Sequence, residues 1–567
     1  MQSKRLNQVV NSSLWAAYGD ALGFITELAD KKILKSRLGE DTRVESLRPW
    51  KRLIGGTHGA LIELPEGVYS DDTQLRLSTS RSIASDGTFD VEIFAKIELP
   101  VFQSYSLGAG RGTKLAAANL AKNNVTYFSN FYSDRGGSYF TSGGNGASMR
   151  IHPHVWSRSN NSDVHRLLFD VFLNTISTHG NMVAIVGAAF HALCTRYSLD
   201  LGAVPNKETC FRIIEEIKSL DSIIRLDSEV DSIWLPSWEQ NSNKTFKEEL
   251  FETLNNTKEL VENVFGFFEN FENSTIENLF LEFNAFDPKV RGSSTLTSVL
   301  AVGIAHYTKS SVDAEEKLRF IVNCLGVDTD TIGTKFGALV GAVLSDRPSE
   351  PVLDSEYIES EARRMFLISQ NQCDSEFKYP DLLSWNAPKY QNSALVNSGS
   401  DVFLEGLGVV RLLSDKTYVG RNESGIWQWV KTGFGQTLLV KRRQVLSKAV
   451  RVSSEIGYKS RNLQGNSFSS AARDSEPVSK SASDIKQSSL DFENDYSAGI
   501  QSRGFRSHGE KLSIDQLTDE AIRSGFDPET IGRHLLMLAD RNAGVERSIA
   551  YTAIVSKARI TRNRKKR

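Results

Sequence analysis

The sequence predicts a mainly α-helical protein that carries a small β-rich unit and a C-terminal group of short helices. Three observations lead to this prediction. Apolar residues recur with helical spacing through residues 1–392, an alternation typical of strands replaces that spacing in residues 398–450, and helical spacing returns in residues 512–567. A chain of 567 residues is long enough for several domains.

Residues 1–392 contain several stripes of apolar side chains three and four positions apart, which is the pattern of a helix face that packs into a core. The clearest stripes are Leu168, Val171, Phe172 and Ile176, then Ile213, Ile214 and Ile217, and finally Ile332, Phe336, Leu339 and Val340. Residues 205–285, which are acidic and rich in Asn and Phe, are predicted to be helices that form in part an insertion. Between helices lie Gly-rich stretches at 55–56, 108–112, 136–137 and 143–146. Gly-rich loops lose much entropy on folding, so we expect them to line a site.

The rest of the chain divides into three predicted parts. Residues 398–450 contain short apolar runs at 409–413 and 426–430, separated by glycines, which favours a small β-rich unit. Residues 451–511 are dominated by Ser, Asn, Asp, Lys and Gly and predict a disordered linker. In residues 512–567, Ser513 or Asp515 could cap one helix, and Asp527 followed by Pro528 predicts the start of another.

Composition places the protein among soluble globular chains. The formal net charge is −2, and the four cysteines show no CxxC spacing, which argues against a zinc or redox motif. The N-terminus lacks the apolar segment of a secretory signal, and no apolar run in the sequence approaches membrane-spanning length, so we expect a cytoplasmic protein with no membrane partner. Contact with nucleic acid is expected only through the basic tail 562–567, for which the alternative is a solvated terminus.

Three acidic clusters stand out: Gly-Asp-Ala-Leu-Gly at 19–23 with Glu27 beyond it, Tyr-Ser-Asp-Asp-Thr-Gln at 69–74, and Gly-Val-Asp-Thr-Asp-Thr-Ile-Gly at 326–333. The last two each place two carboxylates and a hydroxyl at the start of a helical pattern. Such residues can simply cap a helix. Closely spaced carboxylates repel one another unless a cation lies between them, and hard divalent cations such as Mg²⁺ prefer these oxygen ligands. The clusters contain no His or Cys, which argues against zinc.

Taken together, these clusters resemble the ADP-ribosylglycohydrolases. Two further stretches strengthen the resemblance: Gly-Gly-Asn-Gly-Ala-Ser-Met-Arg at 143–150, which is similar to the family's Asn-Gly-x-x-Met-Arg loop, and the pair Thr178-His179. All five motifs occur in family order. The resemblance implies an orthogonal all-helical bundle for residues 1–392. One departure is Val327, which stands where the family commonly has a second glycine.

The resemblance also implies roles for individual residues. It implies two Mg²⁺ ions, for which Mn²⁺ can substitute, held by Ser70, Asp71, Asp72, Asp328, Asp330 and Thr331. It assigns ADP-ribose binding to Asn145, Gly146, Met149 and His179. The candidates for general acid or base are Glu27, Asp71 and Asp72, whereas Asp20 is expected to fix structure rather than bind metal.

The function implied by the resemblance is a magnesium-dependent hydrolase that removes ADP-ribose from a modified protein or another ADP-ribosyl substrate by cleaving the bond at ribose C1″. The alternative is a non-catalytic relative that binds ADP-ribose or serves a structural role. The acidic residues that a decayed site would lose are present, which favours the enzyme. The C-terminal helices are a candidate surface for a protein partner.

Overall fold

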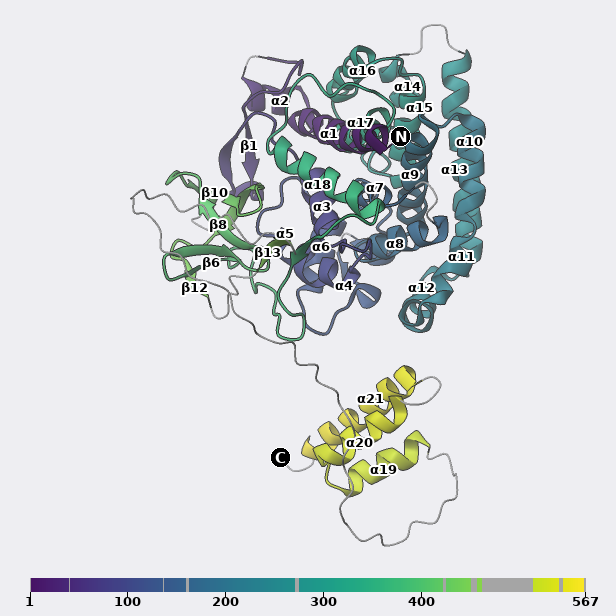
Figure 1. Ribbon diagram of the computed structural model, residues 1–567, viewed down its shortest axis with the longest axis vertical. Helices are drawn as coiled ribbons and strands as arrows, with labels where there is room; N and C mark the ends of the chain where they lie inside the picture. The colour runs from purple at the N-terminus through teal and green to yellow at the C-terminus, as the bar shows by residue number, and fades with distance from the viewer. Residues whose placement is uncertain are drawn as a thin grey trace, which may run out of the picture. The chain divides into compact units, whose positions relative to one another are not determined.

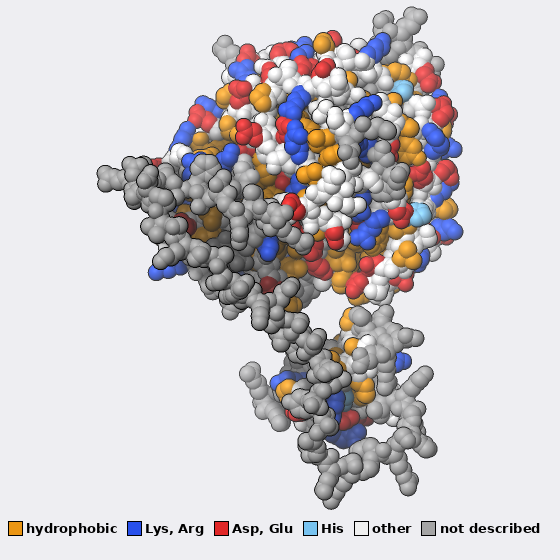
Figure 2. Space-filling model, in the orientation of Figure 1, with side chains coloured by type: hydrophobic (Ala, Val, Ile, Leu, Met, Phe, Trp, Pro, Cys, Tyr) orange, Lys and Arg blue, Asp and Glu red, His pale blue; other side chains and the backbone are white. Residues whose placement is uncertain are grey.

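The computed structural model describes most of the chain, namely residues 2–39, 41–135, 137–159, 163–270, 275–421, 425–449, 456–460, 513–539 and 544–564. The chain forms two compact units, residues 1–468 and residues 469–567. On the face of the first unit drawn in Figure 2, acidic and basic side chains are intermixed, in keeping with a net charge near zero.

The first unit is built mainly from helices that pack around one hydrophobic core (Figure 1). Its longer helices are α1 (Gln2–Thr26), α2 (Lys31–Leu38), α3 (Asp71–Arg81), α6 (Arg111–Leu120), α8 (Val164–Ile176), α9 (Met182–Leu201), α10 (Lys207–Ile217), α12 (Leu235–Ser242), α13 (Phe246–Asn270), α15 (Ser294–His306), α16 (Ser311–Asn323), α17 (Thr329–Gly341) and α18 (Ser355–Ser369). Shorter helices are α4 (Val91–Ile93), α5 (Leu99–Phe102), α7 (His152–Trp156), α11 (Leu220–Ile223) and α14 (Ile276–Glu282). The helices predicted from the apolar stripes are present as α8, α10 and α17, and α10 to α14 occupy the acidic region 205–285.

Helices α1 and α17 lie side by side, at a spacing that only glycine permits (Figure 1). A Cβ atom on Gly19 would lie 2.1 Å from the carbonyl oxygen of Gly333, and a Cβ on Gly337 would lie 2.1 Å from that of Trp15. Similarly, a Cβ on Gly23 would lie 2.5 Å from the backbone of Asp330. The glycines of two acidic motifs therefore bring the start of α17 against the end of α1.

The sequence analysis found no apolar run of membrane-spanning length, but the described residues include a helix, Met182–Leu201, that is long and apolar enough to cross a membrane by length and composition. In this structure most of it is buried inside the first unit, where it packs against α8 and α15.

The predicted β-rich unit is a seven-stranded sheet in the order β11-β10-β8-β7-β6-β12, with β9 pairing to β10. Its strands are β6 (Leu395–Ser398), β7 (Asp401–Leu404), β8 (Gly408–Leu412), β9 (Tyr418–Val419), β10 (Ile426–Thr432), β11 (Thr437–Arg442) and β12 (Ser447–Lys448). Neighbours are antiparallel except for β12, which runs parallel to β6. A hairpin of β1 (Trp50–Ile54) and β2 (Ala60–Leu64), which the sequence analysis did not anticipate, turns at Gly55 and Gly56. A second small hairpin pairs β3 (Ser133–Asp134) with β4 (Gly137–Ser138).

The sheet shares its core with the helical body instead of standing apart from it. Asp354, just before α18, accepts hydrogen bonds from the Thr437 hydroxyl (2.7 Å) and from Lys431 (3.2 Å). On the other side, Lys416 forms an ion pair with Glu63 of the β1–β2 hairpin. Residues 1–392 and 398–450, which the sequence analysis separated, thus belong to one compact unit.

Of the predicted linker, residues 451–511, the structure describes residues 456–460, and residues 451–455 lie outside the described residues. Gly457–Ser460 form strand β13, which pairs antiparallel with β5 (Ser375–Lys378) directly after α18. The Tyr458 ring packs against Phe377, with ring centroids 5.1 Å apart. Residues 461–512, which hold the rest of the predicted linker, lie outside the described residues.

Limited proteolysis should therefore release a fragment that keeps β13. The composition of residues 461–512 cannot bury enough apolar surface to offset the entropy of ordering, so we expect cleavage there and not at residue 450. Mass spectrometry of the stable fragment measures its end. A fragment that ends before Gly457 would contradict the pairing of β13 with β5.

The second unit is a small helical bundle of α19 (Ile514–Arg523), α20 (Pro528–Ala539) and α21 (Gly544–Arg564). Ser513 caps α19 through a reciprocal pair of hydrogen bonds with Gln516. The Asp527 carboxylate accepts a hydrogen bond from the Thr530 backbone N–H (2.8 Å) at the start of α20. The predicted caps at Ser513 and Asp527 are therefore present, whereas Asp515 is not the cap.

Candidate active site

The first acidic helix start is fixed by Asp20. One carboxylate oxygen of Asp20 accepts a hydrogen bond from the Ser70 N–H and the other accepts one from the Thr73 N–H, both at 2.9 Å. These bonds satisfy orphan donors at the start of α3. The Ser70 hydroxyl caps the same helix by accepting from the Asp72 N–H. Asp20 thus has the structural role that was expected. Because Asp20 and Ser70 accept the N–H groups at this helix start, the side chains of Asp71 and Asp72 are not needed as caps.

The second acidic helix start is held against α1. The Thr329 hydroxyl donates to the carbonyl oxygen of Gly23 (2.9 Å) and also meets the Thr26 hydroxyl at 3.1 Å. Asp330 lies in the first turn of α17 and is buried, whereas Asp328 precedes the helix and is partly exposed. The close α1–α17 packing therefore sets the position of both carboxylates.

The two helix starts meet. The Thr331 hydroxyl lies 3.4 Å from a carboxylate oxygen of Asp72, although the two residues are 259 positions apart. Burial raises the pKa values of Asp71, Asp72 and Asp330 well above the ordinary value. The negative charge of Glu27 adds to this rise at Asp71 and Asp330, and that of Asp20 adds to it at Asp72. Carboxylates with raised pKa values favour a neutralising proton or cation nearby.

The donor set of this cluster fits a hard divalent cation in its chemistry. Every metal-ligand atom that the acidic and hydroxyl side chains of the two helix starts offer is a carboxylate or hydroxyl oxygen. Asp72 is buried, and its Oδ2 atom has no hydrogen-bond partner within the described part of the chain. Among the described residues, however, no three Asp, Glu, His or Cys side chains stand close enough to form a ready-made metal site.

The predicted ADP-ribose loop lies beside Asp328. The Asn145 side-chain amide donates to a carboxylate oxygen of Asp328 at 2.8 Å. Gly146 leaves no room for a side chain, because a Cβ there would lie 2.9 Å from the Thr113 hydroxyl and 3.0 Å from the His179 ring. Burial lowers the pKa of His179 to about 3, so its imidazole is neutral at physiological pH. Met149 differs from the other three, because its side chain is buried in the main hydrophobic core.

Sequence analysis missed two buried basic residues, one of which supports the predicted ADP-ribose loop. Arg150 donates to the Gly146 carbonyl and to the side chains of Asn174 and Thr178. Lys335, in α17, donates to the Thr297 hydroxyl at 2.8 Å, and burial lowers its pKa to about 7. Arg150 could have been found in the motif at 143–150, whereas nothing in the local sequence marks Lys335.

Arg52, a third missed residue, lies on the other side of the cluster. Its guanidinium, from strand β1, forms an ion pair with Glu27 at 2.7 Å. The Gly108 backbone also approaches this side, since a Cβ there would lie 2.8 Å from a carboxylate oxygen of Asp71. Arg52 and Gly108 both line a cavity of about 380 Å³, which also reaches Lys114 and the strand-rich sheet.

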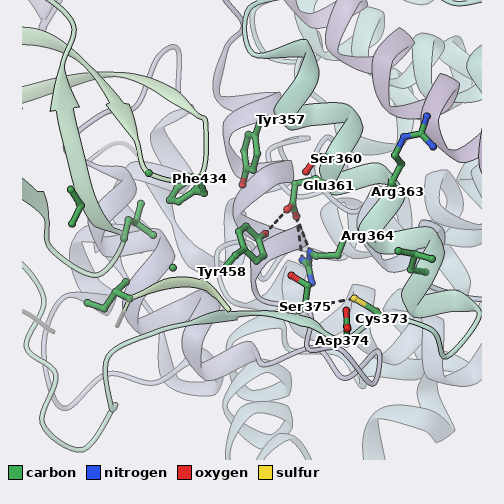
Figure 3. Close-up of a pocket in the computed structure, with 16 residues that line it drawn as sticks. Tyr357, Ser360, Glu361, Arg363, Arg364, Cys373, Asp374, Ser375, Phe434 and Tyr458 are labelled. Carbon is green, nitrogen blue, oxygen red and sulfur yellow. Dashed lines mark hydrogen bonds and ion pairs between the residues drawn. The ribbon is translucent and has the colours of Figure 1, made fainter. Parts of the chain in front are cut away.

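A larger cavity, of about 700 Å³, lies between α18 and the strand pair β5–β13 (Figure 3). Its central carboxylate, Glu361, accepts hydrogen bonds from Tyr458, Arg364 and Ser80. No residue predicted for the active site lines it. Tyr458, Glu361 and Arg364, the polar groups at its centre, are paired with one another.

The first unit is a mainly helical body in which two acidic helix starts meet. A family model described as ADP-ribosylglycohydrolase matches residues 1–368, and the chain belongs to the ADP-ribosylglycohydrolase family. A solved structure titled "ADP-ribosylglycohydrolase-related protein complex" is 22% identical with a TM-score of 0.40, and the match covers 65% of this chain and 99% of that chain. No curated protein matches the chain. The sheet β6–β12, the strand pair β5–β13 and the C-terminal bundle lie beyond the matched residues.

Proposed function

We propose that the protein is a magnesium-dependent hydrolase that releases ADP-ribose from a modified target by cleaving the bond at ribose C1″. The observation that carries the proposal is the meeting of two acidic helix starts, where Asp71, Asp72 and Asp330 are buried with raised pKa values. Family membership supports the glycohydrolase class. Magnesium, for which manganese can substitute, is our inference from the oxygen-only donor set.

Six residues would hold two metal ions, which would supply Lewis acidity and lower the pKa of a bound water. They are Ser70, Asp71, Asp72, Asp328, Asp330 and Thr331. Asn145 would keep Asp328 in place and, with neutral His179, face the ADP-ribose. Glu27 is the best candidate for general base, because its ion pair with Arg52 fixes its carboxylate beside Asp71 and Asp330. The concentrated negative charge would stabilise an oxocarbenium-like transition state.

The test of this function is release of free ADP-ribose from defined substrates linked through arginine, serine or a nucleobase, with and without magnesium. We expect release from at least one linkage, in magnesium only. Tight ADP-ribose binding without any release from the panel would instead favour the non-catalytic relative.

ADP-ribose should raise the melting temperature only when magnesium is present. A ligand that binds only the native state stabilises it, by about 2.7 kcal/mol at one hundred times Kd. If the metal organises the ribose site, a chelator removes that gain. Thermal unfolding with ADP-ribose in magnesium, in manganese and in chelator measures the effect. Equal shifts in magnesium and in chelator would contradict a metal-organised site.

A further inference from the structure

We propose that the strand-rich sheet forms the wall of the active site on the leaving-group side, where Lys441 binds an acidic side chain of the ADP-ribosylated protein. This inference rests on the proposed function and adds the class of target. It assigns a role to residues that lie beyond the family match of 1–368.

The cavity that carries the proposal is the one of about 380 Å³ beside Arg52 and Gly108. The helical body and the β1–β2 hairpin supply one side of it, and strands β10 and β11 supply Trp427, Leu439 and Lys441. The Trp427 ring packs directly on the hairpin turn, because a Cβ on Gly55 would lie 2.6 Å from it. The Lys441 N–H donates to the Ser104 carbonyl at 2.7 Å, which fixes β11 to the body. The wall is therefore rigidly placed.

The cavity and the predicted ADP-ribose loop reach different carboxylates of the acidic cluster. The loop contacts Asp328 through Asn145, at 2.8 Å. Two residues that line the cavity connect it to the cluster. Arg52 forms an ion pair with Glu27, and the Gly108 backbone lies beside the Asp71 carboxylate. A substrate with its ADP-ribose on the Asn145 loop and its C1″ atom at the cluster would direct the leaving group into the cavity.

The basic residues that line the cavity favour an anionic ligand. Arg52 is already paired with Glu27. Lys441 is half-buried, lies over the Trp427 ring at 5.2 Å, and forms no ion pair with a carboxylate among the described residues. A half-buried cation without a counter-charge attracts a ligand that supplies one. A volume of about 380 Å³ suits one carboxylate or phosphorylated side chain, whereas a nucleic-acid backbone would need an extended basic stripe.

The experiment compares two peptides that carry ADP-ribose at the same residue and differ only in a neighbouring Glu or Gln. Pairs are made with arginine and with serine linkage, and an ADP-ribosylated oligonucleotide is the third substrate. We expect the wild type to show a KM about tenfold or more lower for the Glu peptide, the size of one charge-assisted contact. Lys441→Gln should remove this preference and leave kcat unchanged. The matched control is Lys448→Gln, because β12 and β11 are opposite edges of the sheet, and it should keep the preference.

The outcomes separate this proposal from the proposed function. If no substrate is hydrolysed, the function fails, and calorimetric binding of the same peptides in magnesium then tests the cavity alone. Equal binding of the Glu and Gln peptides by the wild type would overturn the role of the cavity. Equal behaviour of the two lysine variants would overturn the role of Lys441, and tighter binding of the oligonucleotide than of either peptide would overturn the choice of a protein target.

Discussion

Asp330→Asn and Asp71→Asn are each expected to abolish hydrolysis while leaving the helical fold intact. Asparagine keeps the shape of aspartate but loses the charge that a magnesium ion requires. The loss should exceed about a hundredfold, because even residues that only support metal ligands cost about 10–100-fold when changed. Steady-state release of ADP-ribose and far-ultraviolet circular dichroism measure the two effects.

Both variants should also be more stable than the wild type in chelator. Burial raises the folded-state pKa values of Asp71 and Asp330 well above the ordinary value. An acid with a raised folded pKa supports stability at low pH, and this support is lost as the pH rises from the unfolded pKa towards the folded one. Asparagine does not ionise. The melting temperature of the variants should therefore exceed that of the wild type by a margin that grows as the pH rises above about 4.

The matched control is Asp163→Asn. Asp163 is the cap of α8, and its carboxylate accepts a hydrogen bond from the His165 N–H at 2.9 Å on the surface. Asparagine caps a helix about as well as aspartate, so this variant should keep full activity. If Asp71→Asn and Asp330→Asn also kept full activity, the two acidic helix starts would be caps and nothing more.

Gly19→Ala is expected to cost a large share of the folding free energy of this protein. Its Cβ would lie 2.1 Å from the carbonyl oxygen of Gly333, so the backbones of α1 and α17 would have to separate. Overpacking a core costs about 1–3 kcal/mol where flexible side chains can shift, and backbone cannot shift as easily, so we expect about 3 kcal/mol or more. The separation also moves Asp330 away from α1, so activity should fall together with stability. Chemical denaturation and turnover measure both.

Gly110→Ala serves as the control, because nothing lies within 4 Å of a Cβ at that position. It precedes α6 with ordinary backbone angles, so the change should cost less than about 1 kcal/mol. Wild-type stability in Gly19→Ala would mean that α1 and α17 are farther apart than the structure places them.

The sequence predicted those parts of the site that are encoded locally. Asp71 and Asp330 fall in short motifs at helix starts, and their positions follow from capping and periodicity. Arg52 could not be predicted, because its link to Glu27 depends on the β1–β2 hairpin folding back on α1. Met149 was assigned to a binding loop, yet a motif does not say which side chain turns into the core. Strand β13 was missed because its pairing with β5 joins chain segments that lie far apart in the sequence, on either side of the sheet.

Helix α3 connects the strand-rich sheet to the acidic cluster. The helix is buried along its whole length, with Asp71 at its start and Arg81 at its end. Arg81 forms a buried ion pair with Glu98 at 2.8 Å and donates to the Gln436 side chain of the sheet at 2.9 Å. In a chain that ends at residue 368, Arg81 would lose its hydrogen bond to Gln436. The apolar face that packs beneath the sheet would be exposed to solvent. The compact unit to which α3 belongs, residues 1–468, therefore extends beyond residues 1–368, which the family model matches.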